Sequence, residues 1–343
     1  MTAQRVLDHA ESGFSLVELL TAMALSLVIV AGMMGLVNPA QRLAVKQPDA
    51  IEMHQRLRVA ASKLMRDLRM AGAGLDSGPA VGPLNGYLPA ILPRRLGALG
   101  TQLSTVARAD IVTLIWVPLT ASQTTTAALF SGTSLDVAHA SGCPSDAACG
   151  LAVGANAVVF DASGHFDLFN VSGLAGSAVS IRGLGPVSGH AYAPGAFVAE
   201  TQIRTYYLDA PAHQLRQYDG DATDTPVIDD VSGFSVEYFG TPDPPHAPMP
   251  ILGTANCLYD TGGRLQPGLQ VLASRTDGLA TLPLGLLSDG PWCGTGGTQF
   301  DADLLRVRRV RVTLGVRDSS STQRLADLVA SFDVAPRNLR AVD

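Results

Sequence analysis

Glu18 is the residue of this chain whose surroundings constrain its chemistry most. It is the only charged residue in residues 14–37, FSLVELLTAMALSLVIVAGMMGLV, an otherwise apolar run. As a helix rising about 1.5 Å per residue, such a run spans a hydrocarbon core of ~30 Å. A lone carboxylate inside lipid costs roughly 3 kcal/mol unless a partner neutralises it. Glu18 therefore predicts a functional charge in a membrane-embedded helix.

A glycine and an aromatic residue, Gly13 and Phe14, stand just before this carboxylate, after a mostly polar start. A secretory signal peptide predicts a shorter apolar run, a basic start and a small-residue cleavage site after the run, and the sequence has none of these. A plain membrane anchor explains the length of the run but not the presence of Glu18. A third interpretation has to account for both features.

Residues 13–19, GFSLVEL, resemble the type IV prepilin cleavage motif. The resemblance implies that residues 1–13 are a leader, that a prepilin peptidase and methyltransferase cuts between Gly13 and Phe14, and that Phe14 is then N-methylated. It also implies an assembly role for Glu18. The new ammonium group of Phe14 on one subunit and the carboxylate of Glu18 on a neighbour would each offset part of the other's cost in lipid.

Two further features of this run concern helix packing. Ala31 and Gly35 form a small-xxx-small pair, which either lets another helix approach closely or reflects the small residues common in such helices. Asn38 and Pro39 are expected to bend or interrupt the helix where it leaves the membrane. We therefore expect a transmembrane and assembly helix over residues 14–37.

An amphipathic continuation of the helix is predicted over residues 38–72. Apolar residues recur there at spacings of three and four, the period of one helix face. They are Met53, Leu57, Ala60, Leu64, Leu68 and Ala71. Gly72 and Gly74 follow as a helix stop. The arginines lie mainly off this stripe, which is more typical of a solvated face than of a subunit contact.

Residues 73–343 are predicted to form a β-rich extracytoplasmic head. The chain holds 35 Gly and 21 Pro, which suits many turns between short strands. Strands are expected near residues 110–117, 156–161, 197–208, 215–218, 231–239 and 306–317. Residues 118–150 and 240–300 are expected to be loop-like insertions. The predicted fold class is α+β, with a long N-terminal helix packed on a large antiparallel β-rich head.

The strand near the C-terminus has an irregular start. Val310 and Val312 share a face with later apolar residues, whereas Leu305 and Val307 are out of phase with them. A bulge near Arg308 is therefore expected. The arginines of this strand could contact DNA phosphates, but a solvated or subunit-facing strand face is favoured, and the net charge of −6 gives no general attraction for nucleic acid.

The four cysteines, Cys143, Cys149, Cys257 and Cys293, all lie downstream of the apolar run. An even count in that position fits disulfides in an oxidising compartment. The sequence permits three pairings, and we favour the local pair Cys143–Cys149 together with Cys257–Cys293. Reduced thiols or a zinc site are the alternative, although no CxxC spacing supports zinc.

The sequence carries no catalytic or cofactor motif: a nucleophile elbow, a P-loop, a Rossmann signature and HExxH are all missing. The seven histidines have no ligand spacing, so each is expected to be an ordinary loop or surface residue. Asp219, Asp221 and Asp224 could bind calcium, but turns favour Asp, and a turn is the preferred interpretation. We therefore expect no enzyme activity, no cofactor, no metal and no specific nucleic acid.

Four downstream stretches look like the PilW group of minor pilins: MRDLRMAGAG, TYYLDAPAHQLRQ, VSGFSVEYFG and SFDVAPRNLR. The resemblance implies a structural subunit of the complex that primes type IV pilus assembly, with a place at the tip. Its implied partners are other minor pilins, the major pilin and the inner membrane. The implied location is a single-pass inner-membrane protein with a periplasmic head, and later the pilus at the cell surface.

Two other functions remain open at this stage. One is a J-type minor pseudopilin of a type II secretion system, which belongs to the same superfamily. The other is an adhesin or DNA-binding pilus subunit, with the predicted loops at 118–150 and 240–300 as its binding surfaces.

Overall fold

The computed structural model describes two compact units, residues 1–53 and residues 54–343. The described residues are 15–75, 84, 87–97, 106–118, 123–139, 143–144, 146–161, 164–184, 189–246, 249–250, 253–294, 299–317, 327–336 and 338–339, without the side chains of 36–50. Gly13 and Phe14 lie outside this set. The two units are treated separately below.

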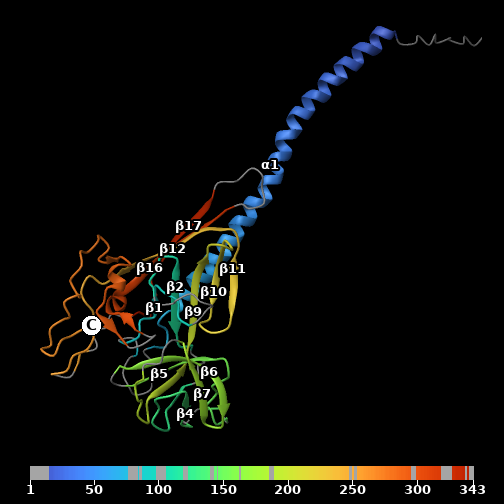
Figure 1. Ribbon diagram of the computed structural model, residues 1–343. Helices are drawn as coiled ribbons and strands as arrows, with labels where there is room; N and C mark the ends of the chain where they lie inside the picture. The colour runs from blue at the N-terminus through green and yellow to red at the C-terminus, as the bar shows by residue number, and fades with distance from the viewer. Residues whose placement is uncertain are drawn as a thin grey trace, which may run out of the picture. The chain divides into compact units, whose positions relative to one another are not determined.

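One long α-helix, α1 (Leu16–Met70), precedes the strands (Figure 1). It runs through Asn38 and Pro39 without a break, so the interruption considered for Pro39 does not occur. A proline removes only one hydrogen bond of a helix, and helix-forming residues continue on both sides. The helix ends at the expected glycines, because Gly72 and Gly74 have φ angles of +80° and +70° that favour glycine.

The apolar stripe of the second part of α1 is buried, as predicted. The buried members of the stripe are Leu57, Ala60, Leu64, Leu68 and Ala71. Arg66 and Arg69 are exposed and so lie off the buried stripe, and the choice of a solvated face over a subunit contact stays a prediction. After the helix, the backbone N–H of Gly72 donates to the carbonyl of Ile115 at 2.9 Å, and Val117 N–H donates to the carbonyl of Ala73 at 2.8 Å. The helix end is thereby attached to the first long strand of the head.

That strand belongs to a five-stranded antiparallel sheet. In spatial order its strands are β1 (Ile91–Leu92), β2 (Ile111–Trp116), β9 (Gln202–Asp209), β10 (Gln214–Tyr218) and β11 (Asp224–Ile228). A four-stranded antiparallel sheet consists of β13 (Ala280–Leu282), β12 (Val231–Gly240), β16 (Val307–Val316) and β17 (Leu328–Val334). The two sheets meet where Val236 N–H donates to the carbonyl of Ala109 at 2.8 Å.

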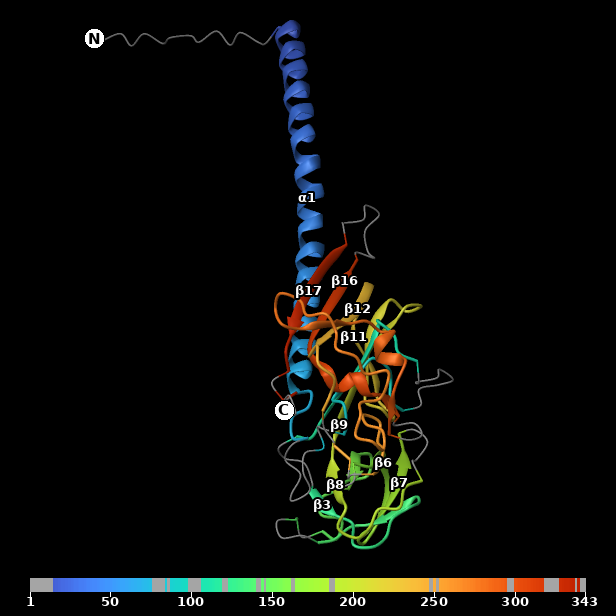
Figure 2. The same ribbon diagram turned by 90° about the vertical axis from the view of Figure 1, so that its left-hand side faces the viewer.

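A six-stranded antiparallel sheet lies at the other end of the head from β12, β16 and β17 (Figure 2). Its spatial order is β3 (Gln123–Thr125), β8 (Phe197–Glu200), β5 (Asn156–Phe160), β6 (Phe166–Ala175), β7 (Ala178–Gly183) and β4 (Ser134–Asp136). A bridge between Thr126 and Val137 joins the two edge strands, so the sheet curls into a barrel-like unit. Part of the expected 118–150 loop is therefore strand, which corrects the prediction.

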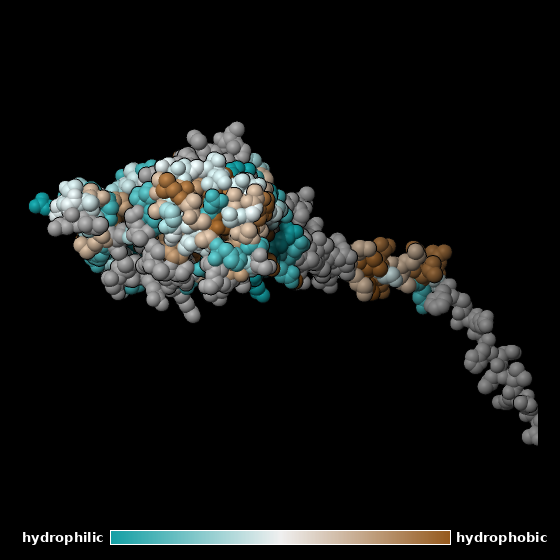
Figure 3. Space-filling model, turned by 90° about the horizontal axis from the view of Figure 1, so that it is seen from below, coloured by the Kyte–Doolittle hydropathy of each residue, from teal (hydrophilic) through white to brown (hydrophobic). Residues whose placement is uncertain are grey.

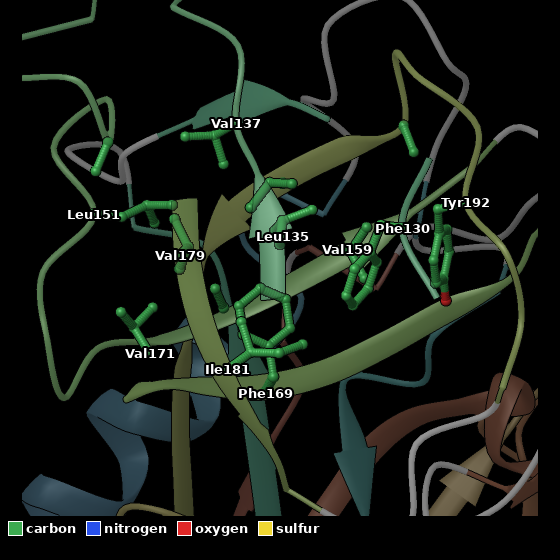
Figure 4. Packing of buried hydrophobic residues seen from close by; sticks show 14 residues of the cluster. Phe130, Leu135, Val137, Leu151, Val159, Phe169, Val171, Val179, Ile181 and Tyr192 are labelled. Atoms are coloured by element: carbon green, nitrogen blue, oxygen red, sulfur yellow. The ribbon is translucent and has the colours of Figure 1, made fainter. Parts of the chain in front are cut away.

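The barrel-like unit has a hydrophobic core of its own. Side chains from its strands point toward one another, with Val159, Phe169 and Ile181 at the centre (Figure 4). Val159 is fully buried and Phe169 is 1% exposed. The short strands β3 and β4 contain too few apolar residues to be recognised by alternation, but Leu135 of β4 is fully buried in this core.

The single strand predicted over residues 197–208 is wrong. The chain forms β8 and β9, which are separated at Thr201 and belong to different sheets. The backbone N–H of Thr201 donates to the carbonyl of Asn156 at 2.8 Å, at the point where the chain passes from one sheet to the next. The apolar alternation continues across the change of partners, so it does not reveal the boundary.

Strand β16 has the irregular start that the sequence predicts. Phe239 pairs with Arg309 and Gly240 pairs with Val307, so Arg308 is the extra residue of a bulge. Leu305 is out of phase because it belongs to a 3-10 helix, Ala302–Arg306. Strands β2, β5, β10, β12 and β16 all lie where the sequence places them.

The 240–300 region has little regular structure, as expected. It contains β13, the 3-10 helix Leu286–Ser288 and strand β14 (Trp292–Cys293), which pairs with β15 (Phe300–Asp301). Arg306 connects parts of this region. Its guanidinium is fully buried and pairs with Asp303 at 2.5 Å. It also donates to the carbonyls of Pro242 and Gln270, each at 2.8 Å. An apolar N-terminal helix followed by a large antiparallel β-rich body confirms the α+β class.

Candidate functional site

Glu18 lies in the first turn of α1, where it takes part in a capping box. Its side-chain Oε2 accepts from the backbone N–H of Ser15 at 3.4 Å, and its own N–H donates to Ser15 Oγ at 3.2 Å. This reciprocal arrangement satisfies two backbone donors that the helix leaves free. Both residues are exposed. The Ser-x-x-Glu spacing is visible in the sequence, and it offers a local role for Glu18 beside the predicted assembly role.

The residues around Glu18 form an apolar surface on all sides of the helix. Residues Leu16–Gly35 have a mean hydropathy of 2.2 and none of this stretch is buried. Leu16 is 76% exposed and Val28 is 70% exposed, and brown atoms predominate on the stretch in Figure 3, with paler and teal atoms between them. By length and composition it could cross a membrane. Such a helix is stable only in lipid or against other helices.

The polar and small residues of this stretch fit such surroundings. Thr21 Oγ1 donates to the carbonyl of Val17 at 3.0 Å, and Ser26 Oγ donates to the carbonyl of Ala22 at 2.7 Å, so both hydroxyls are satisfied within the helix. A Cβ built on Gly35 would meet no atom of the described residues within 4 Å. A packing role of Ala31 and Gly35 with another helix stays a prediction.

A second carboxylate on α1, Asp67, is buried and was not predicted. Asp67 is 3% exposed and accepts from Arg204 Nη1 at 2.8 Å and from the Tyr206 hydroxyl at 2.5 Å. Burial and then the negative charge of Asp67 raise the pKa of Tyr206. Arg204 also lies over the ring of Trp116 at 5.2 Å. Asp67 falls three residues after Leu64, on the buried stripe. This position in the sequence could have indicated that its carboxylate is buried.

The cysteines form the two pairs that the sequence favoured. Cys143 is bonded to Cys149, six residues on, and Cys257 is bonded to Cys293, 36 residues on. The second disulfide closes the poorly structured 240–300 region. Because disulfides persist in oxidising compartments, their presence fits a head outside the cytoplasm.

The three aspartates considered for calcium serve a turn and ion pairs. Asp219 Oδ1 accepts from the backbone N–H groups of Asp221 and Thr223, at 2.9 and 3.0 Å. Asp221 pairs with Arg182, and Asp224 pairs with Arg216 at 3.1 Å. These contacts agree with the turn interpretation.

Two histidines that are distant in sequence meet in space. The rings of His165 and His190 stack, with centroids 3.7 Å apart, and both lie beside Asp161. Both histidines lie outside helices and strands and reach the surface, as expected, but the lack of ligand spacing in the sequence did not reveal that they meet. Sequence spacing could not show it, because the sheet topology brings the two segments together.

Comparison with known proteins supports the interpretation of the N-terminus. Residues 8–34 match the family model described as the prokaryotic N-terminal methylation motif. Comparison with curated proteins and comparison with solved structures found no match. The matched range contains Gly13, Phe14, Glu18 and Ala31, and it covers all of the apolar stretch Leu16–Gly35 except Gly35.

The N-terminal motif and the fold point to the same kind of protein. The motif implies processing by a prepilin peptidase, and an apolar N-terminal helix behind such a motif is consistent with anchoring in the inner membrane before pilus assembly. Proteins of this kind are generally structural subunits rather than enzymes. The chain thus carries an N-terminal methylation motif, and its apolar helix followed by an antiparallel β-rich body is a pilin-like architecture.

Proposed function

We propose that this protein is a minor pilin of a type IV pilus. A prepilin peptidase removes residues 1–13 and methylates Phe14, and the protein then joins other minor pilins in the complex that primes assembly. The observation that carries the proposal is the methylation motif at residues 8–34, placed at the start of an exposed apolar helix. The sites of cleavage and methylation follow from the motif and await measurement.

Glu18 directs assembly in this proposal. It is exposed among apolar side chains, and its hydrogen bonds within the described part of the chain go to Ser15, not to a basic side chain. A carboxylate in lipid costs roughly 3 kcal/mol, so a neighbour's N-terminal ammonium offers a favourable partner. Pairing of the two charges gives each new subunit a fixed axial position along its neighbour.

The large head favours a low-copy position over a repeating shaft. The compact unit that carries it spans residues 54–343, and it includes the barrel-like sheet and the 240–300 region beside the two other sheets. A head of this size limits how closely identical copies can pack. The protein would then lie at the end of the filament, which agrees with the resemblance of its short downstream stretches to the PilW group.

The test separates the charge of Glu18 from its capping role. Glu18→Gln keeps a side chain that can complete the capping box and removes the charge. Ser15→Ala removes the hydroxyl of the cap and keeps the charge. We expect Glu18→Gln to reduce co-purification with partner pilins and pilus number by tenfold or more, while Ser15→Ala changes both less than twofold.

The opposite pattern would show that Glu18 is only a cap. Normal incorporation of Glu18→Gln would remove the assembly role. The same co-purification identifies the partners, and this decides between a pilus and a secretion system. Recovery of minor pilins supports the proposal, whereas recovery of pseudopilins alone would favour the J-type alternative.

A further inference from the structure

The cluster of Asp161, His165 and His190 lies at one end of the barrel-like unit, in the head. Asp161 directly follows β5, and His165 directly precedes β6, so they face each other across the β5–β6 turn. His190 comes from the segment before Tyr192, which bridges to Phe130. Two parts of the chain far apart in sequence thus bring three side chains with metal-binding atoms to one place.

The distances within the cluster suit a shared cation. His190 Nε2 lies 2.7 Å from Asp161 Oδ2, and His165 Nδ1 lies 3.7 Å from Asp161 Oδ1. One ligand atom from each residue lies within 4.8 Å of the other two. Ligand atoms around a tetrahedral zinc ion, with bonds of about 2.0–2.1 Å, are roughly 3.4 Å apart. The two separations, each to a different oxygen of Asp161, lie on either side of that value.

The turn that carries two of the ligands is held in shape by its backbone. Asp161 N–H donates to the carbonyl of His165 at 3.1 Å, and His165 N–H donates to Asp161 Oδ1 at 3.2 Å. Gly164 has a φ of +90°, and a Cβ there would lie 2.1 Å from the ring of Tyr87. The turn therefore requires glycine at this position, and Tyr87 covers it.

The ring of His190 also contacts a buried aromatic ring. The ring of Tyr192 meets it edge-on, with centroids 4.7 Å apart. Tyr192 is fully buried, and its hydroxyl donates to Asp167 Oδ2 at 2.8 Å. Metal-ligating histidines are commonly oriented by such outer contacts. His165, by contrast, has a side chain that is 47% exposed.

The stacked rings have a consequence for binding. Two parallel imidazoles cannot both direct an in-plane nitrogen at one ion, so one ring has to tilt. We expect His165 to be the ring that tilts, because its side chain is the more exposed of the two, whereas His190 lies between Asp161 and Tyr192. A small rotation of His165 opens the stack toward Asp161 and completes a three-ligand arrangement.

We propose that Asp161, His165 and His190 form a binding site for a divalent transition-metal ion, with Zn²⁺ as the preferred ion. Two imidazole nitrogens and one carboxylate oxygen are a donor set typical of zinc, and unlike an all-oxygen set they do not suit calcium or magnesium. Three protein ligands leave a fourth position for water or for a side chain of a partner. The ion would fix the β5–β6 turn to the segment that carries His190.

The test uses the full chain in detergent, without a polyhistidine tag and freed of metal with a chelator. Titration with Zn²⁺ in a calorimeter should show one ion per chain. His165→Ala and His190→Ala should each weaken binding about tenfold or more, as should Asp161→Asn. The controls are His54→Ala and His246→Ala, which remove exposed histidines elsewhere and should leave the affinity unchanged.

Thermal unfolding gives a second measurement. Zinc should raise the Tm of the wild-type chain and of both controls, but not that of the cluster variants, because only a folded site binds the ion. If His190→Ala does not fold, His165→Ala alone decides, since its side chain is exposed. No zinc binding by the wild type at micromolar concentrations, or unchanged binding by His165→Ala, would overturn the proposal. Neither result bears on processing at the N-terminus.

Discussion

Two of the acidic residues of helix α1, Glu18 and Asp67, lie in contrasting surroundings. The side chain of Glu18 is exposed, and in the described part of the chain its carboxylate accepts from the backbone N–H of Ser15. Asp67 is 3% exposed and is bonded to Arg204 and Tyr206. One carboxylate is satisfied by the head of its own chain. The other lies in an apolar surface that a single molecule leaves uncovered.

The apolar side chains of the helix follow the same division. In residues 54–70 most of them lie on one face and are buried by the head, with Val59 and Met70 exposed, whereas in Leu16–Gly35 they surround the helix and none is buried. A one-sided stripe indicates packing within a domain, and an all-round apolar surface indicates lipid or neighbouring helices. Changes downstream should therefore affect the stability of the head, and changes upstream should affect assembly.

The largest expected effect on stability comes from the disulfide of the 240–300 region. Replacing Cys257 and Cys293 together with serine removes a closure of 36 residues, worth about 4 kcal/mol by loop entropy. Chemical denaturation of the full chain in detergent measures the loss. The double replacement of Cys143 and Cys149, six residues apart, is the matched control and should lower stability by about 2 kcal/mol. Equal losses would contradict this ranking.

Asp67→Ala should lower the free energy of unfolding of the head by about 3 kcal/mol. The change leaves Arg204 without its carboxylate, and it leaves the Tyr206 hydroxyl with only the longer contact to Gln217 Oε1 at 3.4 Å. The estimate is at the low end for a broken buried pair, because the side chain of Arg204 is 32% exposed. Fluorescence of Trp116, over which Arg204 lies, reports the transition. A loss below 1 kcal/mol would mean that Asp67 does not anchor the helix.

A much smaller effect is expected for the ion pair on the exposed side of the helix. Arg56 Nη1 lies 3.3 Å from Asp230 Oδ2, and the two side chains are 45% and 29% exposed. Solvent screens such a pair, so Arg56→Ala should cost less than about 1 kcal/mol. The measurement compares the unfolding free energies of Arg56→Ala and Asp67→Ala under the same denaturation conditions. Similar losses for the two variants would remove the distinction between the buried and solvated faces.

Glu18→Gln should leave the unfolding of the head unchanged, within about 0.5 kcal/mol for a surface position. The side chain touches only the first turn of the helix, at Ser15. The same variant is expected to fail in assembly, and the combination sharpens the contrast with Asp67. A clear loss of head stability in Glu18→Gln would mean that this end of the helix supports the fold.

Much of the secondary structure could be predicted from the sequence, because it depends on local periodicity. The stripe from Leu57 to Ala71, the helix stop at Gly72 and the bulge at Arg308 all follow from the spacing of apolar residues. Features that depend on a choice of partners could not be predicted in this way. The change of sheet at Thr201 and the short strands β3 and β4 are decided by what they pair with.

The candidate sites also differ in whether they depend on local sequence or on distant partners. The N-terminal motif is contiguous, so its residues are visible in the sequence, although the capping role of Glu18 was overlooked. Asp67 lies on the buried stripe, but its partners come from β9, more than 130 residues later. The two histidines at Asp161 are 25 residues apart and meet only because the barrel-like unit closes. Contacts between distant segments require the fold.

Mass spectrometry of the N-terminus of the protein isolated from its host membrane tests the central claim most directly. The account predicts a chain that begins with N-methyl-Phe14, because the motif at residues 8–34 directs cleavage after Gly13. An N-terminus at Met1, or one beyond residue 35, would contradict it: the first means an unprocessed anchor, and the second means an ordinary signal peptide.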